Sequence, residues 1–201
     1  MPEKQEQPKP EEVIPPLYSD VPDTHWAKSN IEQLTQKGIL NGTSDNTFEP
    51  DRQITRAEFV KVVVSAFKMT TNPDTKLTFK DCDVNDWFYP YVDAGVSNKI
   101  ISGVSADEFC PDKNILRQDA AVILDNVLLY LGYAMPEAKA VSFTDTHEIS
   151  PYAINAVKLL VDCEIINGMD DGSFAPKGQL TRAQAATLIV KLLDLVGGEV
   201  N

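Results

Sequence analysis

The stretch Ile54-Thr55-Arg56-Ala57-Glu58-Phe59 decides the fold, because the chain contains three versions of it. The others are residues 115–120 (Ile-Leu-Arg-Gln-Asp-Ala) and 180–185 (Leu-Thr-Arg-Ala-Gln-Ala), and each version follows a Phe-x-Pro turn and opens an apolar run. Thr-x-x-Glu and Thr-x-x-Gln are capping boxes, in which the Thr hydroxyl and the Glu or Gln side chain satisfy amides of the first turn. Thr55 and Thr181 are therefore predicted to begin helices, with the arginine at the first helical position.

An arginine at the start of a helix is unfavourable, because the positive end of the helix dipole prefers Asp or Glu by about 0.3–1 kcal/mol. The chain nevertheless places Arg56, Arg117 and Arg182 there. A guanidinium beside free helix amides forms an anion site. The alternative is a solvated arginine retained by duplication, or one paired with a nearby carboxylate. If the arginine serves a ligand alone, Arg56→Ala should weaken binding and leave melting nearly unchanged.

The whole pattern repeats with constant offsets. Trp26 and Trp87 are 61 residues apart, as are Arg56 and Arg117, whereas Arg117 and Arg182 are 65 apart. We therefore predict repeats at residues 17–72, 73–137 and 138–201. Residues 1–16 are rich in Pro and charge, and we expect an extended spacer there, either the end of a linker from a larger protein or the artificial start of an excised fragment.

Each repeat is predicted to form two helices. An aromatic-x-Asp opening leads to a first helix near Trp26, Trp87 or Tyr152, and the first of these helices should end at Gly38. A turn with positive φ is predicted at Gly42, Gly103 and Gly168. The second helix is apolar on most sides and needs neighbours to bury it. The sequence therefore predicts a compact all-α assembly of three helix-loop-helix repeats with approximate threefold symmetry.

Composition excludes several functional classes. The net charge of −12 argues against a nucleic-acid partner, since no basic stripe offsets phosphate repulsion. No apolar stretch reaches the roughly 18 residues that a membrane helix needs, so we expect no membrane insertion. His25 and His147 lie in no metal-type spacing, and three cysteines form no Cys-x-x-Cys pattern. We expect no catalytic residue, no cofactor and no metal, because the loops that are similar to calcium loops lack the bidentate Glu.

At these residues the chain resembles S-layer homology (SLH) domains. The aromatic-x-Asp opening, the Gly-Ile-Leu-Asn-Gly turn, the Phe-x-Pro and the Thr-Arg-Ala-Glu helix start carry the resemblance, over about residues 18–194. It implies a three-pronged pseudo-trimeric unit, monomeric and fused to a larger exported protein at the bacterial cell surface. The implied function is non-covalent anchoring to secondary cell-wall polysaccharide, through a pyruvylated N-acetylmannosamine.

The resemblance also implies a set of carbohydrate-binding residues. Arginines would engage the pyruvyl carboxylate, aspartates would accept from sugar hydroxyls or fix the arginine, aromatics would pack on the sugar, and glycines would let the backbone approach the ligand. These residues are Asp20, Trp26, Gly42 and Arg56 in the first repeat, Asp81, Trp87, Gly103 and Arg117 in the second, and Asp145, Tyr152, Gly168 and Arg182 in the third. The other interpretation makes the tryptophans core residues and the aspartates caps of the first helices.

The three copies differ. The second has Leu116 in place of the capping Thr and loses about 1 kcal/mol, and the third has Tyr152 in place of Trp. We expect the first repeat to hold the most intact site, although grooves between repeats would mix residues of two copies. The rival function is a self-assembly module without carbohydrate binding, which would need an exposed apolar patch rather than arginines in accessible pockets.

Overall fold

The computed structural model describes residues 17–72, 75–133 and 142–197, so the predicted spacer at 1–16 lies outside the described residues. These residues form helices and three isolated β-bridges, and no sheet. None of their helices is long and apolar enough to cross a membrane. The α-helices are α1 (Lys28–Gln36), α2 (Arg56–Ala66), α3 (Tyr89–Ser97), α4 (Arg117–Tyr130), α5 (Ile154–Asp162) and α6 (Arg182–Leu195), with short 3-10 turns at Thr146–Glu148 and Pro151–Ala153.

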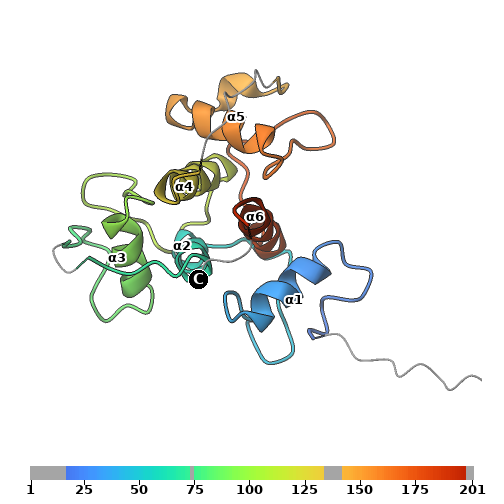
Figure 1. Ribbon diagram of the computed structural model, residues 1–201, viewed down its shortest axis with the longest axis horizontal. Helices are drawn as coiled ribbons and strands as arrows, with labels where there is room; N and C mark the ends of the chain where they lie inside the picture. The colour runs from blue at the N-terminus through green and yellow to red at the C-terminus, as the bar shows by residue number, and fades with distance from the viewer. Residues whose placement is uncertain (1–16, 73–74, 134–141, 198–201) are drawn as a thin grey trace, which may run out of the picture.

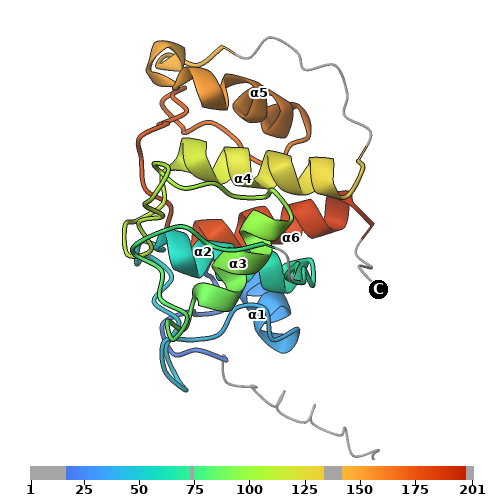
Figure 2. The ribbon, with the colours of Figure 1, turned by 90° about the vertical axis from the view of Figure 1, so that its left-hand side faces the viewer.

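The second helices of the three repeats, α2, α4 and α6, lie side by side at the centre, and the first helices form three prongs around them (Figures 1 and 2). Each prong packs on the central helix of a different repeat: α3 on α2, α5 on α4, and α1 on α6. The third contact closes the ring, because it joins the first repeat to the last. The predicted all-α, three-pronged fold is confirmed, and every lobe is shared between two repeats.

The central helices form where the sequence predicts them. Thr55 and Thr181 cap α2 and α6, and Glu58 and Gln184 complete both capping boxes. Leu116 occupies the same place before α4 and makes no side-chain cap. Nearly all of the apolar side chains of these helices are buried in one continuous core, which is the main source of their stability.

Backbone hydrogen bonds join the starts of the three central helices into a ring. The N–H of Ile54 donates to Leu180 O (3.0 Å), that of Leu180 to Ile115 O (3.2 Å), and that of Ile115 to Ile54 O (3.1 Å). The next amides are also taken, since Arg56 N–H donates to Lys113 O and Ala57 N–H to Pro111 O. The expectation of free helix amides for an anion is therefore wrong, because neighbouring repeats already use them.

The loop before each central helix is held by the opening aspartate. Asp20 accepts from the backbone N–H groups of Phe48 (2.9 Å) and Glu49 (2.7 Å), and Asp81 and Asp145 make the same pair of bonds in the other repeats. These aspartates do not cap the first helices, whose N-caps carry no side-chain bond. The carboxylates order the segment that precedes the arginine-bearing helix.

Positive φ occurs at other positions than predicted. The middle residue of Phe-x-Pro has φ of 55–60° in all three repeats (Glu49, Cys110 and Ala175), whereas Gly42 and its two counterparts have no positive φ. Gly42 is needed for space: a Cβ there would lie 2.5 Å from two backbone oxygens and 2.6 Å from the Tyr18 ring. Gly38, by contrast, has φ of 68° directly after α1, which confirms the predicted helix end.

Candidate functional site: grooves between the repeats

Each arginine at a helix start clamps the loop of the next repeat around the ring. Arg182 donates from Nε to Phe48 O (2.8 Å) and from Nη2 to Asn41 O (2.7 Å). Its guanidinium carbon lies 4.5 Å from the centre of the Phe48 ring, and only 4% of the residue is exposed. Arg56 and Arg117 make the equivalent bonds to Phe109 O and Phe174 O. The arginines are therefore structural clamps, and two of them, Arg182 and Arg56, also line a groove.

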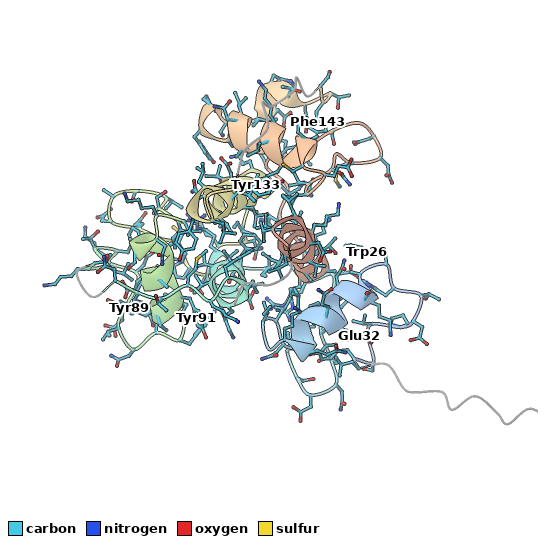
Figure 3. All side chains as sticks on the ribbon, viewed as in Figure 1. Trp26, Glu32, Tyr89, Tyr91, Tyr133 and Phe143 are labelled. Carbon is cyan, nitrogen blue, oxygen red and sulfur yellow. The ribbon has the colours of Figure 1, made fainter. Side chains whose placement is uncertain are left out.

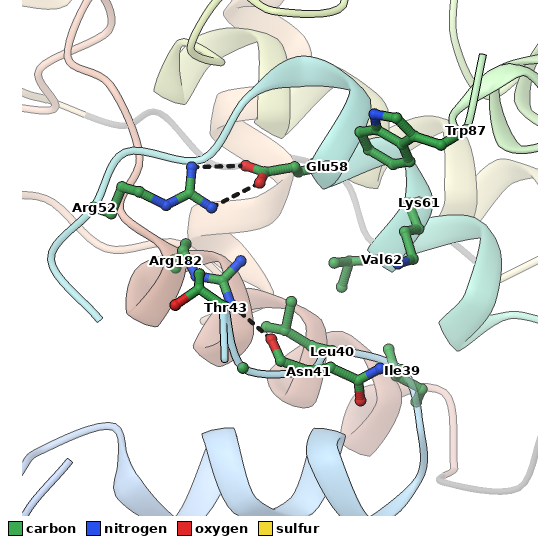
Figure 4. A pocket seen from close by; sticks show the side chains of 11 residues that line it. Ile39, Leu40, Asn41, Thr43, Arg52, Glu58, Lys61, Val62, Trp87 and Arg182 are labelled. Atoms are coloured by element: carbon green, nitrogen blue, oxygen red, sulfur yellow. Dashed lines mark hydrogen bonds and ion pairs between the residues drawn. The ribbon is translucent and has the colours of Figure 1, made fainter. Parts of the chain in front are cut away.

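The first groove, of about 270 Å³, contains residues from all three repeats (Figure 4). Arg182 comes from the third repeat and Trp87 from the second. The first repeat supplies the turn and one side of α2. The six residues that define the first groove here are Asn41, Gly42, Glu58, Lys61, Trp87 and Arg182. The sequence predicts that a groove mixes residues of two repeats, whereas this one has residues of three. The reason is that each first helix packs on the central helix of another repeat.

The first groove carries unpaired positive charge. The Glu58 carboxylate is already engaged, because it accepts from Arg52 (2.7 Å) and from the Thr55 N–H (3.0 Å), as Figure 4 shows for Arg52. Neither Arg182 nor Lys61 takes part in an ion pair among the described residues. Burial lowers the pKa of Arg182 and the nearby Arg52 cation lowers it further, while Glu58 and Glu49 act in the opposite direction. An anion placed here would relieve that repulsion.

An exposed aromatic wall completes the first groove. Trp87 is 55% exposed, and the Lys61 ammonium lies 5.8 Å from its ring centre. The same ammonium lies 5.9 Å from the ring centre of Tyr91, which Figure 3 labels on α3. A flat, half-exposed indole beside two cations can stack on an apolar ligand face while the cations bind a carboxylate.

The second groove, of about 440 Å³, is the same arrangement moved by one repeat. The six residues that define it, in the order used for the first groove, are Ser102, Gly103, Asp119, Val122, Tyr152 and Arg56. Here Arg56 does meet a carboxylate, since its Nη1 lies 3.9 Å from Asp119 Oδ2. Burial lowers the pKa of Arg56, and Asp119 opposes that effect. The second groove is thus electrostatically balanced where the first is positive.

The third arginine clamp joins Arg117 to the loop of the third repeat, where Arg117 Nη2 donates to Asn167 O (2.9 Å). Asn30 on α1 donates to Thr187 on α6 (3.0 Å). By the repeat offsets these two residues correspond to Tyr91 and Lys61. A direct hydrogen bond between prong and centre therefore replaces the cation that lies under the aromatic wall of the first groove.

The twelve predicted site residues divide into three kinds. Trp26, Trp87 and Tyr152 are 62, 55 and 61% exposed, so they are not core aromatics. The aspartates and glycines hold the loops together. Arg182 and Arg56 line the first and second grooves, and each of the three arginines lies with the turn of the next repeat rather than with the turn of its own. Ligand contact by any of the twelve stays a prediction.

Sequence reasoning missed the residues on the groove side of the central helices. The sequence pattern identifies Glu58 and Asp119 only as helix-start residues, and it assigns no role to Lys61. The signal was available, since Glu58 and Lys61 are three positions apart and therefore lie on the same face of the helix.

Comparison with known proteins agrees with this architecture. The family model of the S-layer homology domain matches residues 17–60, 78–121 and 142–186. The chain is 28% identical over 174 residues to the Surface-layer 125 kDa protein of Lysinibacillus sphaericus, covering 85% of this chain and 14% of that protein. It is 30% identical over 115 residues to a Cellulosome-anchoring protein of Acetivibrio thermocellus, covering 55% and 26%.

Similar enzymes share the same region. An Amylopullulanase of Thermoanaerobacterium thermosulfurigenes is 31% identical over 181 residues, which is 90% of this chain and 10% of the enzyme. The chain thus spans a small part of these long relatives, and the shared part is the anchoring domain rather than a catalytic one. Three tandem matches on three structurally equivalent repeats show that the chain belongs to the S-layer homology domain family, which places it at the cell surface.

Proposed function

We propose that this chain is a non-catalytic anchor that holds a larger surface protein to the cell wall by binding a pyruvylated N-acetylmannosamine of the secondary cell-wall polysaccharide. One observation carries the proposal: the first groove holds two cations without a carboxylate partner, Arg182 and Lys61, beside the exposed ring of Trp87. The chain as a whole has a net charge of −12, so this local positive charge is the exception.

The chemistry of the ligand matches the groove in each part. A ketal carboxylate is a compact anion that a guanidinium edge and an ammonium can bind together. The ketal methyl and the sugar ring offer apolar faces for the indole. Two relatives, a surface-layer protein and a cellulosome-anchoring protein, support by their names an anchoring role for the shared domain.

The test is a calorimetric titration with a synthetic pyruvylated N-acetylmannosamine glycoside, beside the same glycoside without pyruvate. We expect heat of binding that depends on the pyruvate. If neither glycoside binds and the protein is still retained on wall sacculi, another wall polymer is the ligand. If neither binds and sacculi do not retain the protein, the chain is a self-assembly module and the proposal is overturned.

A further inference from the structure

The acidic residue three positions into the central helix has opposite surroundings in the two grooves. Glu58 of the first groove accepts from Arg52 and from the Thr55 amide, and it makes no ion pair with Arg182 among the described residues. Asp119 of the second groove faces Arg56 and the Tyr152 hydroxyl. We infer that Asp119 closes the second groove to carboxylates and makes it a site for an uncharged sugar residue, while the first groove takes the anionic one. This inference rests on the proposed function.

The cause lies in the missing cap of α4. Leu116 has no hydroxyl, so the capping box cannot form there. The second bond of a capping box, which the backbone N–H of Leu116 would donate to the Asp119 carboxylate, is also absent among the described contacts. The position of Arg52 is occupied by Lys113, which forms no ion pair with Asp119 among the described residues. Asp119 therefore lacks both groups that bind Glu58, the cap amide and an arginine at the position of Arg52. Its side chain is also one methylene shorter than that of Glu, and its carboxylate turns to the groove instead.

A hydrogen-bond network then fixes Asp119 in that position. The Tyr152 hydroxyl donates to Asp119 Oδ1 (2.6 Å) and accepts from Gln118 Nε2 (2.7 Å). Gln118 is only 1% exposed, and its amide oxygen accepts from the Ser150 N–H (3.1 Å). The first and third repeats have Ala57 and Ala183 at this place. The second repeat is thus the one whose side chains lock the acid to the aromatic wall.

The consequence for ligands follows from charge. A carboxylate that approached Arg56 would also approach Asp119, and the two like charges would repel each other in a partly buried site. Val122 stands where the first groove has Lys61, so no second cation compensates. Sugar hydroxyls, by contrast, find acceptors in Asp119 and in the Ser102 carbonyl, a donor in Arg56, and a ring face in Tyr152.

The experiment follows the NMR chemical shifts of two reporter groups in this protein. The Trp87 indole N–H reports on the first groove and the Tyr152 ring on the second. The probes are the pyruvylated N-acetylmannosamine glycoside and its uncharged parent. The proteins are the wild type, Asp119→Asn, Asp119→Glu, which keeps the charge, and Asp112→Asn, which removes one exposed negative charge of the same repeat outside both grooves.

We expect the pyruvylated probe to shift Trp87 in all four proteins and to shift Tyr152 only in Asp119→Asn, with affinity at least tenfold above the wild type. The uncharged probe should shift Tyr152 in the wild type. The inference is overturned if the pyruvylated probe shifts Tyr152 as strongly as Trp87 in the wild type. It is also overturned if Asp119→Asn gains nothing, if Asp112→Asn gains as much, or if the uncharged probe leaves Tyr152 unmoved. A silent Trp87 would instead count against the proposed function.

Discussion

The first and second grooves have the same backbone, the same arginine clamp and the same kind of aromatic wall, yet their electrostatics differ. In the first, Arg52 pairs with Glu58 and Lys61 adds a cation. In the second, Asp119 pairs with Arg56 and a valine replaces the lysine. Positions that maintain the fold are therefore repeated, whereas positions that set the charge of the groove are free to vary, because the clamp does not depend on them.

The largest expected effect comes from breaking an arginine clamp, a feature that each groove has. Arg182→Ala removes two charge-assisted hydrogen bonds and leaves the carbonyls of Phe48 and Asn41 without their donor. Unfolding free energy should fall by about 3 kcal/mol, and first-groove binding should be lost with it. Denaturant unfolding followed by circular dichroism measures the first effect. A fully stable Arg182→Ala protein with weak binding would match the sequence-based expectation for Arg56→Ala, and would show that the clamp matters little.

The charge difference can be tested without touching the clamp. Lys61→Val gives the first groove the residue of the second, and it removes a cation that has no ion pair among the described residues. Affinity for the pyruvylated glycoside should fall about tenfold, or about 1.4 kcal/mol, with melting unchanged. The reciprocal Val122→Lys should raise affinity for the same probe at Tyr152. Unchanged affinity in both variants would remove Lys61 from the account of the first groove.

The missing cap can be restored. Leu116→Thr combined with Asp119→Glu copies the capping box of α2 onto α4. We expect a gain of about 1 kcal/mol, seen as a rise of roughly 2–4 °C in Tm for a chain of this size. The reoriented acid should also leave Arg56 and admit the pyruvylated probe. Leu116→Thr alone is the control, and a rise in Tm without new binding would separate the cap from the charge.

The smallest expected effect concerns acid stability. Burial alone would raise the pKa of Glu58, but hydrogen bonds from Arg52 and the Thr55 amide outweigh it and the pKa is lowered. The stabilisation by this group is therefore complete above the unfolded pKa of about 4.3 and is lost as pH falls through the lower folded value. Glu58→Gln, which copies Gln184, should unfold with a shallower pH dependence below that pH. Identical slopes for variant and wild type in acid titrations would contradict this.

The twelve predicted site residues illustrate how far sequence reasoning reached. The offsets between repeats located every arginine, aspartate and exposed aromatic at equivalent positions. The positive φ predicted at Gly42 is wrong, because its need for space next to Tyr18 and two loop carbonyls arises from residues 24 positions back and a few positions ahead. The pattern alone cannot distinguish a glycine that needs positive φ from one that needs room.

The sequence pattern also does not predict which residues share a groove, because the contacts again join residues that are distant in the sequence. Arg56 lies with Gly103 and Tyr152, rather than with Gly42 and Trp26 of its own repeat. The exchange arises because each prong packs on the central helix of the preceding repeat, so contacts join residues from about 50 to more than 130 positions apart.

The sequence by itself determined the three repeats, the helices and their caps, and the family, because these depend on local patterns that recur at constant spacing. Only the tertiary structure decided that the helix amides are used within the ring, that Glu58 pairs with Arg52 and that Asp119 pairs with Arg56. Those outcomes depend on which side chains of other repeats lie within a few ångströms, and no local pattern carries that information.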